Sequence, residues 1–84
     1  MSYSIIWDSK ALKFLNKLQK DIILRIINKL DIIKEDPFRY LEHYEGKNYY
    51  KLRIGIYRAL IDIDFKNQTL SIQVLDKRGR IYKR

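Results

Sequence analysis

The sequence predicts a single α+β domain in which a helical hairpin packs on one face of a small twisted sheet, in the order β-α-α-β-β-β. In the N-terminal half, apolar residues recur every three or four positions, which is typical of amphipathic helices. From residue 49 onward they alternate with polar residues, which is typical of strands with one buried face. The 84 residues suffice for one domain that buries roughly two thirds of its unfolded surface.

The N-terminal half predicts one strand and two helices. Residues 3–7 are β-prone and end at Asp8-Ser9, a pair in which either residue can cap a helix. A first helix is expected from about residue 9 to 18, and a second one begins at Asp21. Pro37 ends the second helix, because the residue before a proline is pushed out of helical geometry. The helices share one apolar face, formed by Ala11, Leu12, Phe14, Leu15, Leu18, Ile22, Ile23, Ile26, Ile27, Leu30 and Ile33.

Three strands are expected in the C-terminal half, at residues 49–54, 56–64 and 69–76. Gly55 permits a tight turn between the first two strands, and a polar loop separates the second from the third. The residues from 77 to 84 are too charged and too short to add another core element. The helices and the three C-terminal strands therefore account for most of the predicted domain.

The first of these strands has two chemically different faces. Lys51 and Arg53 share one face with Tyr49, because side chains alternate along a strand, and that face is basic. The opposite face is apolar and is expected to pack under the helices. The residues assigned to this core-facing side are Tyr50, Leu52, Ile54 and, on the next strand, Tyr57.

Positive charge is concentrated in the C-terminal half. The formal net charge is +8, of which about +2 lies before residue 43 and about +6 after it. Clustered Lys and Arg with interleaved tyrosines favour nucleic acid as a partner. No apolar run is long enough to span a bilayer, and no secretory signal is visible. The absence of cysteine fits a cytoplasmic protein.

Several kinds of catalytic site are excluded by composition. His43 is the only histidine and cysteine is absent, so neither a multi-histidine nor a thiolate metal site is available, and no cofactor is expected. His43 itself is expected to be an ordinary surface residue. Asp62 and Asp64 could form a carboxylate pair on one strand face, but a solvated or lysine-paired strand edge is the simpler interpretation.

The basic residues of the predicted sheet are the candidates for a functional site. Lys51, Arg53 and Arg58 lie on neighbouring strands, and Arg78 and Arg80 could approach the same face. The planar guanidinium group suits phosphate, because it holds two phosphate oxygens at once and stays charged. Neighbouring cations disfavour the protonated form of Lys51, which could let it act as a base near neutral pH. An ordinary solvated basic surface is the alternative interpretation.

The order and spacing of these elements resemble a known family. After the helical hairpin, residues 52–58 read Leu-Arg-x-Gly-x-Tyr-Arg, and residues 77–82 read Lys-Arg-x-Arg-x-Tyr. In both blocks, and over nearly the whole chain, the sequence is similar to the RelE toxins of the RelE/ParE superfamily. Compact archaeal-type members end in a similar Arg-Gly-Arg-x-Tyr-Lys, so the chain most resembles that subgroup.

The resemblance implies the toxin component of a type II toxin–antitoxin system. Such a toxin is an endoribonuclease that cuts mRNA in the decoding site of the ribosome and is held inactive by a RelB-like antitoxin. In the reaction, the 2′-hydroxyl attacks the adjacent phosphate without a metal ion. The products are a 2′,3′-cyclic phosphate and a free 5′-hydroxyl.

The resemblance also assigns roles to individual residues. Lys51 falls at the candidate general base, and Arg58 at the arginine that stabilises the negatively charged transition state. Arg78 falls at an arginine that acts as general acid or phosphate clamp, and Tyr82 at a tyrosine that stacks on a base. In some members a second lysine lies two residues before the base, where this chain has Tyr49. Further contacts to RNA are expected from Arg53, Lys77, Arg80 and Lys83.

Two other functions remain open at this point. ParE-type relatives poison DNA gyrase without the nuclease residues, which would make the chain a protein-binding inhibitor. A non-catalytic module that binds RNA or DNA through its basic face is the third possibility. The first helix is equally open, since a solvated helix face or a landing surface for ribosomal RNA would explain Lys10, Lys13, Lys17 and Lys20.

Overall fold

One five-stranded sheet organises residues 2–43 and 49–77, the part of the chain that the computed structural model describes. Its strands are β1 (Ser4–Trp7), β2 (Glu42–His43), β3 (Tyr50–Ile54), β4 (Tyr57–Asp64) and β5 (Thr69–Lys77). They lie in the order β1-β5-β4-β3-β2. β1 is parallel to β5, and the other neighbours are antiparallel. The basic strands β3 and β4 are therefore adjacent.

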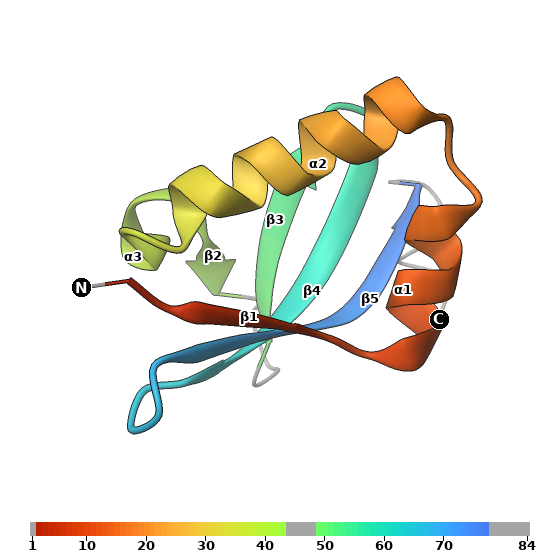
Figure 1. The fold of residues 1–84 in the computed structure, drawn as a ribbon. Coiled ribbons are helices and arrows are strands. Elements are labelled where there is room, and N and C mark those ends of the chain that lie inside the picture. The colour runs from red at the N-terminus through yellow and green to blue at the C-terminus, as the bar shows by residue number, and fades with distance from the viewer. Residues whose placement is uncertain (1, 44–48, 78–84) are drawn as a thin grey trace.

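Two helices cover one face of this sheet (Figure 1). α1 (Ser9–Asn16) lies against β5, and α2 (Lys20–Ile33) crosses over the strands. Asp8 caps α1, because its Oδ2 accepts a hydrogen bond from the backbone N–H of Lys10 at 3.1 Å. No helix among the described residues is long and apolar enough to cross a membrane.

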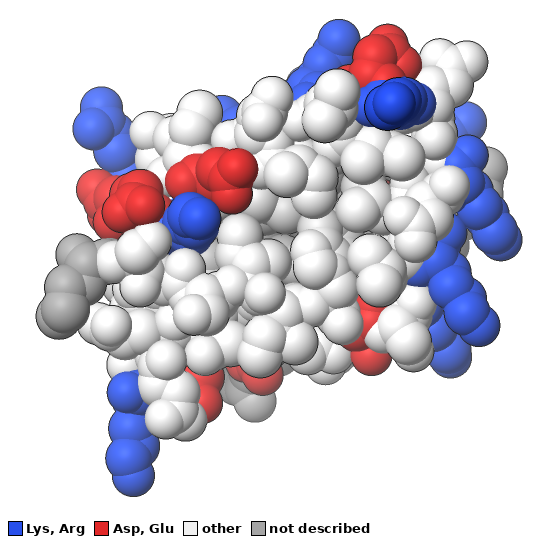
Figure 2. Space-filling view, viewed as in Figure 1, with Lys and Arg blue, Asp and Glu red and all other residues white. Residues whose placement is uncertain are grey.

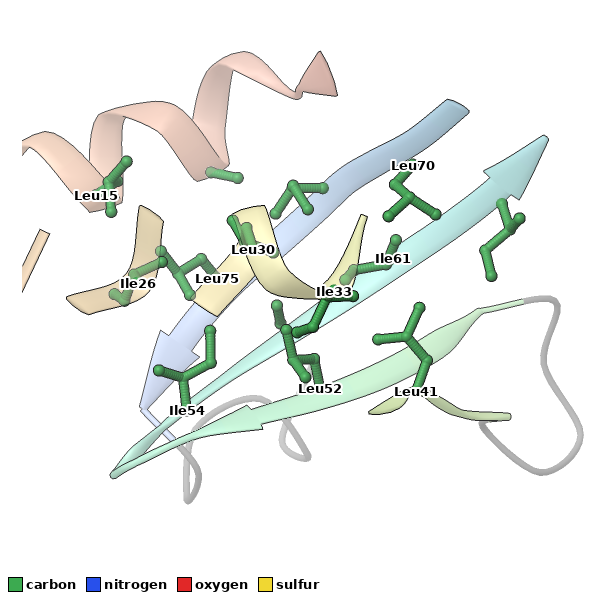
Figure 3. Close-up of a cluster of buried hydrophobic side chains, with 14 residues drawn as sticks. Leu15, Ile26, Leu30, Ile33, Leu41, Leu52, Ile54, Ile61, Leu70 and Leu75 are labelled. Atoms are coloured by element: carbon green, nitrogen blue, oxygen red, sulfur yellow. The ribbon is translucent and has the colours of Figure 1, made fainter. Parts of the chain in front are cut away.

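The hydrophobic core fills the space between the helices and the sheet (Figure 3). Ile26, Leu30 and Ile33 lie on one face of α2, because three- and four-residue spacings bring side chains to the same side of a helix. They meet Leu52 and Ile61 of the sheet. Burying each such side chain contributes about 1.5–3 kcal/mol. The largest fully buried side chains are Ile26, Leu30, Ile33, Ile61, Leu70 and Ile72.

The predicted fold class is confirmed, with two additional short elements. α3 (Pro37–Tyr40) and β2 lie between α2 and β3, in a segment whose sequence shows no periodicity. α2 ends at Ile33, before Pro37. Pro37 lies in the first turn of α3, where a backbone N–H would make no hydrogen bond within the helix, so proline is tolerated there. The observed order is therefore β-α-α-α-β-β-β-β.

The predicted boundaries of the other elements change by a few residues. α1 ends at Asn16 rather than at residue 18, and α2 begins one residue before Asp21, with Gln19 in the cap position. β5 extends to Lys77, which was expected to belong to the tail. These shifts do not alter which faces of the elements are buried.

The hairpin of β3 and β4 has the predicted apolar face. Leu52 and Ile54 are buried, and Tyr50 and Tyr57 are half-buried against the core. Gly55 forms the turn with a φ of 58°, a left-handed conformation that glycine adopts without strain. The core interpretation of these residues is confirmed, and the opposite face of the hairpin is left for charged residues.

Candidate active site

Three charged side chains form one row across the sheet, on the face away from the helices. Arg53 on β3 pairs with Arg58 on β4, and Arg58 pairs with Asp76 on β5. Residues directly opposite each other on antiparallel strands share a face, so all three side chains lie on the same side. The neighbouring row, on the helix-facing side, consists of the buried residues Leu52, Ala59 and Leu75.

Lys51 lies on the same face of β3 as Arg53, and it has an acidic neighbour. Its Nζ is 3.6 Å from Oε2 of Glu42, which is the residue paired with it on the edge strand β2. The Glu42 side chain is 77% exposed and that of Lys51 is 31% exposed, so solvent screens the ion pair. The surroundings of Lys51 are therefore not purely cationic, in contrast to the expectation from the sequence.

A pocket of about 190 Å³ joins these residues. This volume is smaller than the ~300–1,000 Å³ of typical small-molecule sites, and it suits a single phosphate group with part of its sugar. Four cations and one carboxylate line the pocket, so its net charge favours an anion. The lining residues are Lys29, Tyr40, Glu42, Lys51, Leu52, Arg53 and Arg58.

Lys29, Tyr40 and Glu42 are site residues that sequence reasoning missed. Lys29 comes from α2 and Tyr40 from α3, and the Lys29 ammonium lies 5.2 Å from the centre of the Tyr40 ring. This distance is within the range of a cation–π contact, which fixes the lysine at the edge of the pocket. The only available signal was that Lys29 interrupts the apolar pattern of α2, and that signal does not distinguish a site from ordinary surface.

Part of the predicted site lies outside the described residues, namely Arg78, Arg80, Tyr82 and Lys83. Lys77 is described, and it pairs with Tyr57 at the end of β5. Because side chains alternate along a strand, Lys77 lies on the opposite face from Asp76. The structure thus brings Lys51, Arg53 and Arg58 together and does not bring Lys77 to them.

The other candidate residues are surface residues, as the simpler interpretations predicted. His43 is exposed, and its ring meets that of Tyr50 edge-on at 5.1 Å. Asp62 and Asp64 are both exposed. Asp64 accepts hydrogen bonds from the Asn67 side chain, at 2.8 Å, and from the Asn67 backbone, and both lower the pKa of Asp64. Asp64 therefore has a structural role at the turn between β4 and β5. No group of three or more metal-binding side chains occurs among the described residues.

The lysines of α1 form a separate basic surface. Lys10, Lys13 and Lys17 line a groove of about 310 Å³ between α1 and β5. Figure 2 shows Lys and Arg side chains gathered along the side of the molecule where α1 lies, beside a broad uncharged area. Among the described residues, this groove is a basic region separate from the pocket at β3.

Comparison with solved structures gives a consistent result over nearly the whole chain. The toxin–antitoxin complex RelBE from Mycobacterium tuberculosis contains a chain that matches 93% of this chain and 100% of its own length, with a TM-score of 0.82 and 25% identity. A chain of the archaeal RelE–RelB complex from Pyrococcus horikoshii matches with a TM-score of 0.80 and 26% identity, covering 95% of this chain and 99% of its own. The chain has the RelE toxin fold.

The RelE resemblance indicated by the sequence blocks is thereby confirmed. The isolated RelE toxin of Escherichia coli also matches, with a TM-score of 0.77 and 22% identity over 98% of this chain and 93% of the toxin. No protein-family model matches the sequence, and no curated protein does. The RelE fold is therefore recognised mainly through the arrangement of helices and strands. The pocket at β3 is a feature of this fold in the present chain.

Proposed function

We propose that this chain is the toxin of a type II toxin–antitoxin system and that it cleaves mRNA on the ribosome. The observation that carries the proposal is the pocket itself. On a RelE fold, Lys51, Arg53 and Arg58 line one small cavity whose net positive charge suits a phosphodiester. Among the described residues that line the pocket there is no histidine and only one carboxylate, that of Glu42.

The reaction would proceed by attack of the 2′-hydroxyl of one nucleotide on its own 3′-phosphate. The 2′-oxygen forms a bond to phosphorus, and the bond to the 5′-oxygen of the next nucleotide breaks. Lys51 takes the proton of the 2′-hydroxyl, and the departing 5′-oxygen takes a proton from Arg78 or from water. Arg58 and Arg53 meet the additional negative charge on the phosphate, and preorganised cations of this kind supply much of the acceleration.

Arg78 serves better as an electrostatic stabiliser than as the acid. An arginine guanidinium stays protonated far above neutral pH, so it gives up a proton reluctantly. A water molecule or the ribosome can deliver the proton to the leaving oxygen instead. The proposal therefore assigns transition-state stabilisation to Arg78 as well as to Arg58 and Arg53.

Dependence on the ribosome follows from the simplicity of this site. A small pocket with four cations holds a phosphate but does little to orient the sugar that carries the attacking hydroxyl. Orientation of the reacting groups can supply about 7–11 kcal/mol of a barrier. A ribosome that presents a bent mRNA would provide this orientation.

The proposed partner is a RelB-like antitoxin, as in the complexes to which the chain is similar. A groove of about 670 Å³ between α2 and the β3–β4 turn is a suitable docking surface. Leu24 and Ile32 are each 54% exposed on its wall, while Arg25, Lys29 and Arg53 add positive charge. An acidic segment with alternating apolar residues would match both properties.

Occupation of this groove would also inhibit the toxin. Lys29 and Arg53 line both the groove and the pocket at β3. A partner segment that pairs with them would neutralise part of the charge that attracts mRNA. One surface would thus serve recognition of the antitoxin and suppression of the activity.

The experiment that tests the proposed function maps mRNA ends. The purified protein is added to ribosomes programmed with a defined mRNA, and the new 5′ ends are located by primer extension. We expect discrete cuts within the codon at the decoding site, carrying 5′-hydroxyl groups. A parallel assay of DNA gyrase supercoiling covers the ParE alternative, and inhibition of gyrase without mRNA cleavage would overturn the proposal.

A further inference from the structure

Asp76 is the only buried charged side chain among the described residues, with 3% of its surface exposed. Removing a carboxylate from water is costly unless hydrogen bonds and cations compensate for the lost hydration. The proposed reaction gives Asp76 no role, although it lies on the same face of the sheet as Arg53 and Arg58. Its position therefore calls for an explanation of its own.

The carboxylate of Asp76 is held next to Arg58. Its Oδ1 accepts a hydrogen bond from the backbone N–H of Lys77 at 2.8 Å, which restricts rotation of the carboxylate. Arg58 is its direct partner in the β4–β5 pairing, and opposite residues of this kind have Cβ atoms about 4.5–5.5 Å apart. Arg58 is itself half-buried, and its Nε is shielded from solvent.

Arg58 thus lies between two opposite influences. Arg53, its partner on β3, repels it, whereas Asp76, its partner on β5, attracts it. Arg53 is exposed and can adjust, while Asp76 is buried and fixed. Of the two neighbours, Asp76 therefore offers Arg58 a fixed opposite charge.

We propose that Asp76 is a positioning residue, which holds the Arg58 guanidinium in the orientation at which it meets the phosphate during cleavage. This inference rests on the proposed function, because that reaction supplies the phosphate. Asp76 acts through Arg58 and does not touch the substrate. Its negative charge also lets Arg53 and Arg58 occupy one rung of the sheet without Arg58 turning away.

Asp76→Asn tests the proposal, because it keeps the size of the side chain and the acceptor for Lys77 but removes the charge. We expect the single-turnover cleavage rate on saturating ribosomes to fall by about 10²-fold, the effect of a ~1 Å misplacement at a reacting group. The ribosome concentration at half-maximal rate should stay that of the wild type. The matched control is Asp62→Asn, which removes an exposed carboxylate from the same face of the sheet and should cleave normally.

A double variant and a spectroscopic measurement separate positioning from general damage to the fold. Arg58→Ala combined with Asp76→Asn should cleave no more slowly than Arg58→Ala alone, because Asp76 acts only through Arg58. The Nε–H resonance of Arg58, assigned by its absence in Arg58→Lys, should shift in Asp76→Asn and exchange faster with water. In Asp62→Asn it should remain unchanged.

The Arg58 Nε–H resonance tests the positioning role of Asp76 even if the wild-type protein does not cleave mRNA. An Arg58 Nε–H signal that is the same in the wild type and in Asp76→Asn would overturn the positioning role. Additive losses of cleavage in the double variant would overturn it as well. Absence of wild-type cleavage, together with a shifted resonance, would overturn the proposed function and leave the contact between Asp76 and Arg58 in place.

Discussion

Arg53 and Arg58 lie directly opposite each other on β3 and β4, so two guanidinium groups share one rung of the sheet. Like charges in this arrangement destabilise the pairing of two strands. A bound phosphate would relieve the repulsion, since it could accept hydrogen bonds from both groups. The arrangement is thus unfavourable in the free protein and favourable in a complex with a polyanion, which is the expected property of a binding site.

Arg53→Glu should stabilise the free protein while it weakens the activity. The glutamate would turn the repulsion into a cross-strand attraction, which should raise the free energy of unfolding by about 0.2–1 kcal/mol. It would also place a negative charge beside the substrate phosphate, so cleavage on ribosomes should fall by about 10²-fold. Chemical denaturation and single-turnover cleavage measure the two effects. Lys66→Glu, in an exposed turn, is the control for net charge, and an equal loss of cleavage there would argue against a specific site.

Arg58→Ala and Arg78→Ala should each lower single-turnover cleavage by about 10²-fold or more, because both are proposed to stabilise the transition state. Arg58→Ala should also lower the free energy of unfolding by about 1–3 kcal/mol, since it deprives the buried Asp76 carboxylate of a neighbouring cation. Thermal melts detect this second effect. Lys13→Ala, on the exposed face of α1, should change only the affinity for ribosomes. If both arginine variants cleave at the wild-type rate, the catalytic assignment fails.

Lys51→Arg separates the role of a base from that of a cation. Arginine keeps the positive charge but does not release its proton near neutral pH. If Lys51 takes the proton of the 2′-hydroxyl, Lys51→Arg should lose cleavage to the same extent as Lys51→Ala, by about 10²-fold or more. The measurement is single-turnover cleavage on saturating ribosomes. A Lys51→Arg variant that keeps most of its activity would show that the lysine acts through its charge alone.

The parts of the fold that the sequence predicts are those with a long regular pattern. Ile26, Leu30 and Ile33 repeat at helical spacing, and the alternation of polar and apolar residues in β3 is enough to assign Lys51 and Arg53 to one face of that strand. α3 and β2 contain four and two residues, which is less than the pattern of either element needs to appear. Their existence depends on the sheet to which they attach.

The residues that the sequence does not reveal join the site through contacts between distant segments. Glu42 reaches Lys51 only because β2 adds to the edge of β3, and Lys29 reaches the pocket because α2 crosses over that strand. Asp76 is adjacent in sequence to predicted RNA-binding residues, but its relation to Arg58 depends on the register of β4 and β5. Neither a strand register nor a helix crossing can be read from local periodicity.

Leu24→Asp should weaken binding of the antitoxin without altering cleavage. Leu24 is 54% exposed on the groove between α2 and the β3–β4 turn, so an aspartate there is tolerated by the fold but repels an acidic, apolar segment. The matched control is Leu12→Asp, at an exposed leucine of α1 outside this groove. The affinity of a RelB-like antitoxin is measured by calorimetry at two salt concentrations, and it should fall as salt rises. Equal weakening by the two variants would place the antitoxin elsewhere.

The most direct test of the whole account compares one mRNA in two states, free in solution and bound to ribosomes with a defined codon in the decoding site. The cleavage rate of each is measured with the same concentration of protein, and the ends of the products are analysed. We predict rapid cutting of the ribosome-bound mRNA, with a 2′,3′-cyclic phosphate on the upstream product, and negligible cutting of the free mRNA. Equal rates on the two substrates, or intact mRNA in both, would contradict the account.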